Sequence, residues 1–594
     1  MASIVTHQFR RNGVQSIFDE MVYPSTMING CSSTGAVITA PSTVSSAVQN
    51  GMLVVISTAT SGALSTSATI VTAVSAGGNT ITVSPAPIAN LSGALLSFYH
   101  QYYVGIGKSD PFAGNLDGSD SFPGVPVPSE RTSTETRANL IALQRVLAGT
   151  IPGNPAIFGN AGLLIPRFNW TNNTFYKAWD PSDPTCFYPS TVASSSGVQV
   201  TIFPCFVVSQ NKLFLCATSG YEVGGFPSSN DPATITTGSI GTIGNLGTNG
   251  YRWIYVSDIG LDSIGTLNAA FLPGSTVSLA SITTNSTLDS NQFIRVYRNA
   301  TTSTASGTSS RITTPTSSAG VIYSMRIAAG GAGYKYGDSF TIDGDGVVTA
   351  SGIVTGINTS AGGTITAVQI GNPGYGYTIG STRFTSGTGK SAVLIPRIGP
   401  INGFGYDVAS NFPSWYAGFY ATFPYSTVYP GTTDVPGADT IRQVSLIRNP
   451  VVYTSTTGST YTFRCLKYVI VNTSSASVSI GDVIEASNLG RGFVDYVDST
   501  GSNSTVYYHQ NSSAFNSDVL GSLNITPIPL STGSFAVYRR VNGYAKVTSS
   551  YAITSASRSE EYEPNTGEVI FIQNRTPITQ VAGQNVNVTV VTQF

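Results

Sequence analysis

Short apolar runs that alternate with polar residues recur along most of this chain and favour strands over helices. The final segment, residues 567–594, shows the pattern clearly: residues 586–590 alternate valine with Asn or Thr, after an apolar run around Phe571. Alternation of period two is typical of a half-buried strand, so this segment is predicted to form strand, turn, strand, with the break at Thr576 and Pro577. Strands with so little charge aggregate unless they pair within a sheet, so upstream segments are expected to pair with them.

The same pattern predicts many further strands. A strand over residues 3–9 is expected to precede a short helix whose apolar face holds Ile17 and Phe18. The stretch 220–250, which is dominated by Gly, Ser, Thr and Asn, is predicted to be a surface loop. Other strands are predicted to begin at Tyr102 and to cover residues 52–57, 68–74, 80–83, 202–208, 213–216, 251–256, 461–471, 492–497 and 534–540.

One segment carries the signals of a longer helix. Thr132 and Glu135 have the spacing of a capping box, in which the two side chains accept from backbone N–H groups of the first turn. Leucines at the first, fourth and eighth positions from Leu140 fall on one helical face, and Gly149 stands where a helix commonly ends. We therefore predict a helix over residues 132–149, lying beside the strands.

An internal repeat follows at an offset of 43 residues. The sequence GVIYSMRIAAGGAGYKYGD, from Gly320, matches GTITAVQIGNPGYGYTIGS, from Gly363, and aligns Tyr334 with Tyr377. Each unit is predicted to be a strand, a glycine-tyrosine turn and a second strand, which is too little to bury an apolar face alone. The two copies are therefore expected to pack against each other as a small separable domain over residues 319–398, with the two tyrosines in equivalent environments.

Composition narrows the class of protein. Charged residues make up 10% of the chain, against about 25% in an average soluble protein, while 63 glycines punctuate the strands. A hydrophobic content of 41% can fill several cores, so a disordered chain is excluded. This combination is typical of all-β extracellular or virion proteins. A net charge of −1 provides no field that attracts nucleic acid or an anionic membrane, so neither is expected as a partner.

The sequence contains no recognisable targeting signal and no cysteine motif. The first residues contain no apolar signal segment, and no apolar run is long enough to span a bilayer, so we expect synthesis in the cytoplasm and no membrane span. The five cysteines include no CxxC pair, so their spacing indicates neither a zinc site nor a disulfide framework. Buried free thiols are expected at Cys31, Cys186, Cys205, Cys216 and Cys465.

Two glycine-rich segments invite a ligand interpretation. The segment SGTGKS, residues 386–391, resembles a phosphate loop, but Phe384 occupies the position where that loop needs its first glycine, which favours a plain turn. The segment DGDG, residues 343–346, offers two carboxylates without the later Glu of a calcium loop. A hairpin turn is the favoured interpretation there, and calcium is the alternative.

Catalytic constellations are not evident. His7, His100 and His509 stand beside no Ser or Cys nucleophile in a recognisable motif, whereas Asp and Glu are scattered widely enough to leave a glycosidase pair open. The 30 Tyr and 27 Phe would suit sugar stacking, but sandwich cores and subunit interfaces use the same residues. We therefore assign no catalytic, cofactor-binding or metal-binding residue, and expect no enzyme activity and no cofactor.

Seven segments carry a family resemblance. GEVIFIQNRTPI from Gly567, RQVSLIRNP from Arg442 and YYVGIGKSDPF from Tyr102 resemble the baseplate wedge subunit, the gene eight product, of T-even-type contractile-tailed bacteriophages. No single segment is a specific motif, but all occur in the family's order, which chance seldom produces. Four further segments fit the same order: SIVTHQFR from Ser3, LLIPRFNW from Leu163, KLFLCA from Lys212 and NGYRWIYVSDI from Asn249.

The resemblance implies a β-sandwich core with helix-bearing loops, a homodimer, contacts to other baseplate wedge proteins, no catalysis, and a final location in the virion tail baseplate. The family's members are shorter, so the intervening stretches are interpreted as insertions. The predicted fold is thus mainly β, with a discontinuous multilayer β-sandwich core. That core is assigned residues 1–30, 100–318, 399–450 and 557–594, and the three inserted small β domains are assigned residues 31–99, 319–398 and 451–556.

A second hypothesis comes from another functional class. A tail-associated protein that binds or cleaves host glycan would use the inserted domains for recognition. A cleft with two carboxylates within about 10 Å of each other would favour this hypothesis, whereas family-like segments at both ends of the chain favour the wedge subunit.

Overall fold

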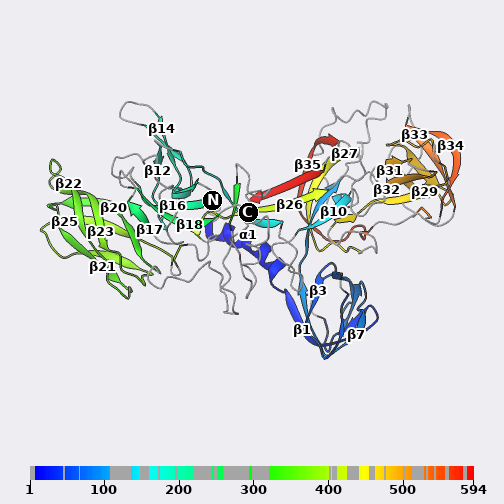
Figure 1. Cartoon of the computed structure of the whole chain (residues 1–594), viewed down its shortest axis with the longest axis horizontal. Helices are drawn as coiled ribbons and strands as arrows, with labels where there is room; N and C mark the ends of the chain where they lie inside the picture. The colour runs from blue at the N-terminus through cyan, green and yellow to red at the C-terminus, as the bar shows by residue number, and fades with distance from the viewer. Residues whose placement is uncertain are drawn as a thin grey trace. The chain divides into compact units, whose positions relative to one another are not determined.

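The structure is a computed structural model of the whole chain (Figure 1). It divides into two compact units: a first unit of Met1–Ile17, Ala148–Gly418 and Val590–Phe594, and a second unit of Phe18–Leu147 and Phe419–Thr589. The residues that the structure describes are 7–44, 47–65, 67–107, 136–137, 140–146, 160–171, 174–193, 199–209, 212–219, 243–246, 251–258, 293–296, 320–400, 403–404, 411–423, 440–453, 462–473, 476–499, 502–510, 528–529, 533–540, 544–554, 561–579 and 585–593.

The chain begins with helix α1 (His7–Val22). The predicted apolar face is confirmed, since Ile17 and Phe18 are buried and Phe18 stacks on Phe419 with ring centroids 5.9 Å apart. The predicted strand over residues 3–9 is wrong for its last three residues, which form the first turn of the helix, where their carbonyl groups accept its first hydrogen bonds. Residues 3–6 lie outside the described part. Among the described residues, no helix is both long and apolar enough to cross a membrane.

The segment from Thr26 to Tyr99 closes into a barrel (Figure 1, blue), and each barrel strand pairs with two others. The strands predicted at 52–57, 68–74 and 80–83 are confirmed as β3, β5 and β6. The barrel interior is apolar and buried, and includes Val54, Val71 and Leu96. In order around the barrel, the strands are β1 (Thr26–Thr34), β2 (Val37–Thr39), β6 (Thr80–Ser84), β5 (Thr69–Val74), β3 (Leu53–Thr58) and β8 (Ala94–Tyr99), with a separate ribbon of β4 (Ser61–Ala63) and β7 (Ala89–Ser92).

A five-stranded antiparallel sheet follows the barrel in the second unit. It joins segments from three distant parts of the sequence, so its pairing is almost entirely non-local. Its strands, in spatial order, are β28 (Thr462–Arg464), β10 (Leu140–Val146), β9 (Tyr102–Gly107), β27 (Thr440–Arg448) and β35 (Glu568–Thr579).

Strand β10 corrects the predicted helix. Residues 140–146 form a strand between β9 and β28, whereas residues 136–137 are helical as predicted. The other residues of the predicted 132–149 helix lie outside the described part. All of the strand except Gln144 is buried. A strand whose residues are buried on both faces is typical of the centre of a sheet, and the helical spacing of its leucines did not determine its structure.

The C-terminal strands pair with upstream segments, as predicted. Strand β35 pairs with β27, with Phe571 opposite Leu446. The predicted break at Thr576 and Pro577 is wrong, because β35 continues to Thr579 and accommodates the proline where its register with β27 shifts. The final strand belongs to a four-stranded sheet of β19 (Phe293–Val296), β11 (Ala161–Pro166), β26 (Tyr416–Phe423) and β36 (Val586–Gln593).

Two further sheets of the first unit surround a cluster of aromatic rings centred on Trp253. The strand predicted over residues 202–208 is interrupted at Pro204, and its two parts join different sheets. The predicted loop 220–250 contains strand β17; its other residues lie outside the described part. One sheet is β12 (Phe175–Tyr176), β14 (Gln199–Phe203) and β13 (Ser190–Ala193), and the other is β15 (Phe206–Ser209), β16 (Lys212–Thr218), β18 (Arg252–Asp258) and β17 (Ile243–Leu246).

The repeated segment forms its own pair of sheets (Figure 1, green). Each repeat contributes three strands rather than the two expected, and the repeats exchange strands: the first strand of each pairs with the last strand of the other. The pairs are β20 (Ile322–Ala332) with β25 (Lys390–Ile398), β22 (Ser351–Asn358) with β23 (Thr364–Asn372), and β21 (Ser339–Gly344) with β24 (Gly380–Phe384).

The two repeat tyrosines occupy matching environments, as predicted. Tyr334 and Tyr377 are 5% and 2% exposed. The Tyr334 N–H donates to the Gly363 carbonyl at 3.0 Å, and the Tyr377 N–H donates to the equivalent Gly320 carbonyl at 3.1 Å. Each ring is also covered by a glycine of the other repeat: a Cβ on Gly389 would lie 2.3 Å from Tyr334, and one on Gly346 would lie 2.4 Å from Tyr377.

We expect residues 319–398, expressed alone, to fold, because their described strands form two complete sheets over a core that includes Phe340 and Leu394. Circular dichroism should show β structure and a cooperative thermal transition. The Gly389→Ala variant should lower or abolish that transition, whereas Gly337→Ala, where a Cβ meets nothing within 4 Å, should have a smaller effect. An unfolded wild-type segment would contradict the separable domain.

The third predicted insertion contains a six-stranded antiparallel sheet with a buried core that includes Val494 and Val506. The strand predicted over residues 461–471 is divided, because β28 joins the five-stranded sheet and β29 joins this one. The strands predicted at 492–497 and 534–540 are confirmed. The strands of the six-stranded sheet, in spatial order, are β29 (Lys467–Val471), β32 (Ser504–His509), β31 (Arg491–Asp498), β30 (Val483–Ala486), β33 (Ser534–Arg540) and β34 (Tyr544–Ala552).

Candidate functional site

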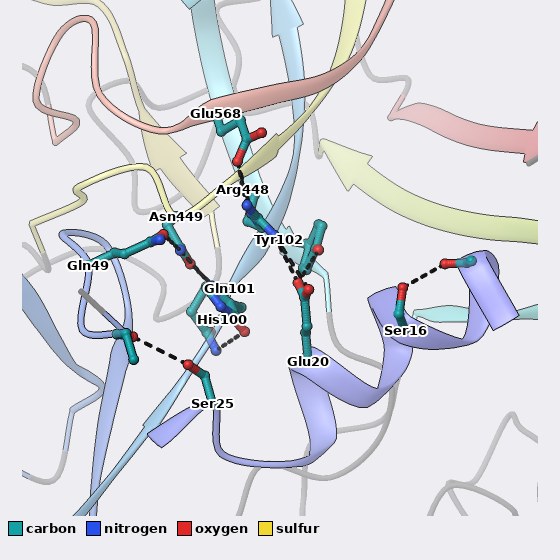
Figure 2. Close-up of polar contacts among 12 residues, drawn as sticks. Ser16, Glu20, Ser25, Gln49, His100, Gln101, Tyr102, Arg448, Asn449 and Glu568 are labelled. Atoms are coloured by element: carbon teal, nitrogen blue, oxygen red, sulfur yellow. Dashed lines mark hydrogen bonds and ion pairs between the residues drawn. The ribbon is translucent and has the colours of Figure 1, made fainter. Parts of the chain in front are cut away.

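A dense polar cluster lies where the chain leaves the barrel and enters the five-stranded sheet (Figure 2). Its residues come from α1, from the loop before β3, from the start of β9, from the end of β27 and from the start of β35, all within the second unit. We call it the barrel clasp and define it as Glu20, Gln49, His100, Gln101, Tyr102, Arg448, Asn449 and Glu568.

Asn449 is the centre of the barrel clasp. Its N–H donates to the Gln101 carbonyl at 2.7 Å, and its Oδ1 accepts from the Gln101 N–H at 2.9 Å. Its Nδ2 approaches His100 Nδ1 at 2.7 Å and Gln49 Oε1 at 3.3 Å (Figure 2). Asn449 adopts a left-handed conformation, with φ of 50°, which asparagine tolerates better than most residues and which turns the chain before Pro450.

These contacts define the hydrogen-bonding state of His100. Asn449 Oδ1 is engaged by a backbone N–H, which can only donate, so the Nδ2 group must be the side that faces His100. An amide NH₂ only donates, and His100 Nδ1 therefore acts as the acceptor. His100 is consequently neutral in this arrangement, with its proton on Nε2.

The barrel approaches Asn449 without intervening side chains. Gly51 has φ of +85°, and a Cβ at this position would lie 2.0 Å from the Asn449 carbonyl oxygen. Only glycine allows this backbone-to-backbone contact. Together with Gln49, it attaches the loop before β3 to the turn that follows β27.

Arg448 forms the second half of the barrel clasp. Its guanidinium donates to Glu568 at 2.6 Å and to Glu20 at 3.1 Å, and the Tyr102 hydroxyl donates to Glu20 at 2.7 Å (Figure 2). The arginine side chain is 22% exposed. These contacts attach α1 and β35 to adjoining ends of β9 and β27.

The electrostatics of the barrel clasp favour its present protonation states. Burial, followed by the hydrogen bond to Glu20, raises the pKa of Tyr102, so its hydroxyl remains a donor. Burial alone lowers the pKa of Arg448, but its bond to Glu568 and the neighbouring negative charges outweigh this and raise the pKa overall. Burial also lowers the pKa of His100, against the opposing charge of Glu20.

The contacts of the barrel clasp join separate elements of the second unit. Glu20 and Glu568 could be mistaken for a glycosidase pair, but the Arg448 guanidinium binds both of them. Both carboxylates are thereby held in ion pairs with Arg448. The barrel clasp therefore fixes the barrel, α1 and the sheet ends to one another.

The barrel clasp is expected to weaken in mild acid. Because the pKa of His100 is lowered in the folded protein, the stability that its neutral form contributes is present above about pH 6.5 and is lost as the pH falls through the folded-state pKa. Protonated Nδ1 would confront the Asn449 NH₂ group with a second donor. Thermal unfolding of the intact protein between pH 8 and 5 should therefore show a decline in stability.

The His100→Asn variant provides the matched control, since its Oδ1 can accept from Asn449 and does not titrate. Its stability should vary less with pH than that of the wild type. Equal pH dependence in the two proteins would show that the titration of His100 does not control the barrel clasp.

The candidates from the sequence lie elsewhere. In the DGDG turn, Asp343 pairs with Arg383, and Asp345 accepts from the N–H groups of Thr378 and Ile379 and from the Thr378 hydroxyl. The bond from the Thr378 side chain and the backbone bonds lower the pKa of Asp345 to about 2. This arrangement holds the ends of β21 and β24 together.

The remaining candidates are not brought together. The SGTGKS segment connects β24 to β25. The His509 ring pairs with the buried Asp495 at 2.6 Å in the six-stranded sheet, and His7 is the first residue of α1, its side chain lying outside the described part. Among the described residues, no group of three or more His, Cys, Asp or Glu side chains is placed to hold a metal ion.

A second buried polar site was not predicted. Asp180, 4% exposed, accepts from Arg397 Nε at 3.2 Å and lies 3.5 Å from Arg326 Nε. The arginines come from β25 and β20, whereas Asp180 follows β12, so this site attaches the repeat domain to the remainder of the first unit. Tyr323 of β20 packs nearby against Phe404, with ring centroids 5.0 Å apart.

The chain matches no model of a protein family and no curated protein.

Proposed function

We propose that this chain is a structural subunit of the baseplate wedge of a bacteriophage contractile tail, associating with itself and with neighbouring wedge proteins during virion assembly. The observation that carries the proposal is the adjacency of the family-like segments. Three of these segments are remote from one another in sequence: residues 102–112, 442–450 and 567–578. Their described parts lie on three consecutive strands of one sheet, β9, β27 and β35.

A second group of family-like segments shows the same adjacency. The segments KLFLCA and NGYRWIYVSDI lie on β16 and β18, which pair directly in the first unit. Such adjacency is expected if the chain retains a family core and accommodates additional domains around it. A chance resemblance would distribute the segments without regard to pairing.

The stretches without family resemblance support the same organisation. The strands of the barrel pair only with one another among the described residues, and so do those of the repeat domain and of the six-stranded sheet. A domain can be inserted into a surface loop at modest cost, because closure entropy grows slowly with loop length. The additional domains can therefore be accommodated without altering the pairing of the core.

The proposed role requires association rather than chemistry. In the barrel clasp and around Asp180, the charged groups are engaged in holding elements together, and a near-neutral, low-charge surface lacks the repulsion that keeps proteins apart. We propose that the protein acts without catalysis or a cofactor, and that after synthesis in the host cytoplasm it resides in the tail baseplate.

Sedimentation of the purified chain tests self-association. At micromolar concentration, the proposal predicts a species of twice the monomer mass of 61.9 kDa. A monomer under these conditions would contradict the homodimer. A monomer that binds only heterologous wedge proteins would still be compatible with a wedge subunit.

A tail-associated glycan-binding protein is the second candidate. The observation that favours it is Tyr336 of the repeat domain, whose side chain is 70% exposed and could stack on a sugar ring. Binding of the intact protein to host-surface glycan, lost in a Tyr336→Ala variant, would support it. If the variant binds as well as the wild type, or if the wild type does not bind, the exposure of Tyr336 gives no support to a glycan-binding function.

A further inference from the structure

Three buried cysteines lie together in the first unit. Cys205 Sγ is 3.6 Å from Cys186 Sγ, and the two residues are 0% and 2% exposed. The Cys216 N–H donates to the Cys205 carbonyl at 2.7 Å. At 3.6 Å, the first two sulfur atoms are in van der Waals contact, with no room for another atom between them.

The backbone geometry around these two thiols also suits a disulfide. The Cys205 N–H donates to the Cys186 carbonyl at 2.9 Å, so the two segments are direct neighbours. A disulfide needs its two Cα atoms within about 4.4–6.8 Å of each other, and a direct backbone hydrogen bond between the two residues brings them side by side. Bond formation requires the sulfur atoms to approach by roughly 1.5 Å, which side-chain rotation can supply.

Surrounding structure holds both residues in place. Cys186 lies in the 3₁₀ turn η2 (Pro184–Phe187), which Asp183 caps by accepting from the Thr185 N–H at 2.9 Å. Cys205 is bonded through its backbone to Cys186 on one side and to Cys216 of β16 on the other. The thiols are therefore brought together by the fold.

We propose that Cys186 and Cys205 are a thiol-oxidation site that closes to an intramolecular disulfide when the folded chain meets a two-electron oxidant. Two S–H bonds break and one S–S bond forms. With the azo oxidant diamide, the two electrons and two protons pass to the N=N bond, which becomes a hydrazine. The bond ties the β13 and β14 hairpin into a closed loop.

The site is expected to react slowly at neutral pH. Burial, followed by the neighbouring Cys186, raises the pKa of Cys205, and only the thiolate is an effective nucleophile. The reaction should accelerate as the pH rises. The inference rests on this geometry alone and does not depend on the proposed baseplate role.

Thiol mapping of the intact, reduced protein tests the site. After exposure to diamide, unfolding in the presence of N-ethylmaleimide should label all but two of the five thiols, and mass spectrometry should find the peptides of Cys186 and Cys205 joined. Reduction should release them. The oxidised protein should also unfold at a higher temperature, because the closed loop restricts its unfolded chain.

Single variants provide the controls. Cys186→Ser and Cys205→Ser should each keep their four remaining thiols, whereas Cys31→Ser should still form the bond. Five labelled thiols after oxidation of the wild type, or a bond mapped to Cys205 and Cys216, would overturn the proposal. The wild-type peptide map decides the matter even if a variant fails to fold.

Discussion

Replacing Gly51 with alanine is expected to lower the free energy of unfolding of the second unit by about 3 kcal/mol or more, which is among the largest effects of a single substitution. The new Cβ would lie 2.0 Å from the Asn449 carbonyl oxygen and 2.4 Å from the carbonyl carbon, so the two backbones must separate. Separation also disrupts the contacts of Asn449 with Gln49 and His100. Chemical denaturation of the full chain, followed by hydrogen exchange in residues 440–448, measures the effect.

Gly77→Ala is the matched control. Gly77 also has a positive φ, +67°, but a Cβ there meets nothing within 4 Å. Its cost should be limited to the left-handed backbone, about 1–2 kcal/mol. If both substitutions destabilise the protein equally, the loss at Gly51 comes from its left-handed backbone alone. The contact between the barrel and Asn449 then contributes nothing to stability.

The second large effect is expected from Asp180→Asn. The change removes the carboxylate that neutralises Arg397, whose side chain is 5% exposed, and loss of one member of a buried ion pair costs about 3–5 kcal/mol. Although burial acts to raise it, the pKa of Asp180 is lowered by its bonds to Ser182 and Arg397. The wild type should therefore be more stable than the variant at neutral pH, and this difference in stability should be lost as the pH falls below about 4.

Asp343→Asn is the control for this pair. Asp343 also binds an arginine, Arg383, but their side chains are 45% and 64% exposed. Solvent screens such a pair, so the unfolding midpoint should barely change. Equal losses from the two variants would mean that Asp180 does not attach the repeat domain through a buried charge.

Local pattern predicted the strands whose signal lies within the strand itself. The strands predicted at 80–83 and 534–540 are present because alternation of apolar and polar residues matches one buried and one exposed face. The mainly β fold followed from many such runs. The matching of Tyr334 with Tyr377 followed from the repeat, since similar sequences bury equivalent positions.

Elements that depend on distant partners were not predicted. Leu140 and the six residues after it carry leucines at a helical spacing, but β9 and β28 pair with them and convert the segment to a strand. The three strands of each repeat pair mainly with the other repeat, which no window of sequence shows. Pro577 continues β35 because the ladder to β27 shifts where its missing N–H would lie.

The barrel clasp was also invisible to sequence patterns. Asn449 and His100 are 349 positions apart, and nothing near either residue indicates the other. The one local signal is the Asn-Pro dipeptide at Asn449, which favours a turn. The sequence does not distinguish Gly51 from the other glycines, because glycine is frequent throughout this chain. Its close contact with Asn449 could therefore not be predicted.

Electron micrographs of purified contractile-tailed particles, labelled with gold-conjugated antibodies against this chain, test the wedge assignment most directly. Antibodies raised against the repeat domain, residues 319–398, avoid the family-like segments that a wedge subunit would bury in assembly. A baseplate wedge subunit should carry gold at the end plate of the tail, distal to the head. Gold on the head, along the sheath or on fibres alone, or particles that carry none of this protein, would contradict it.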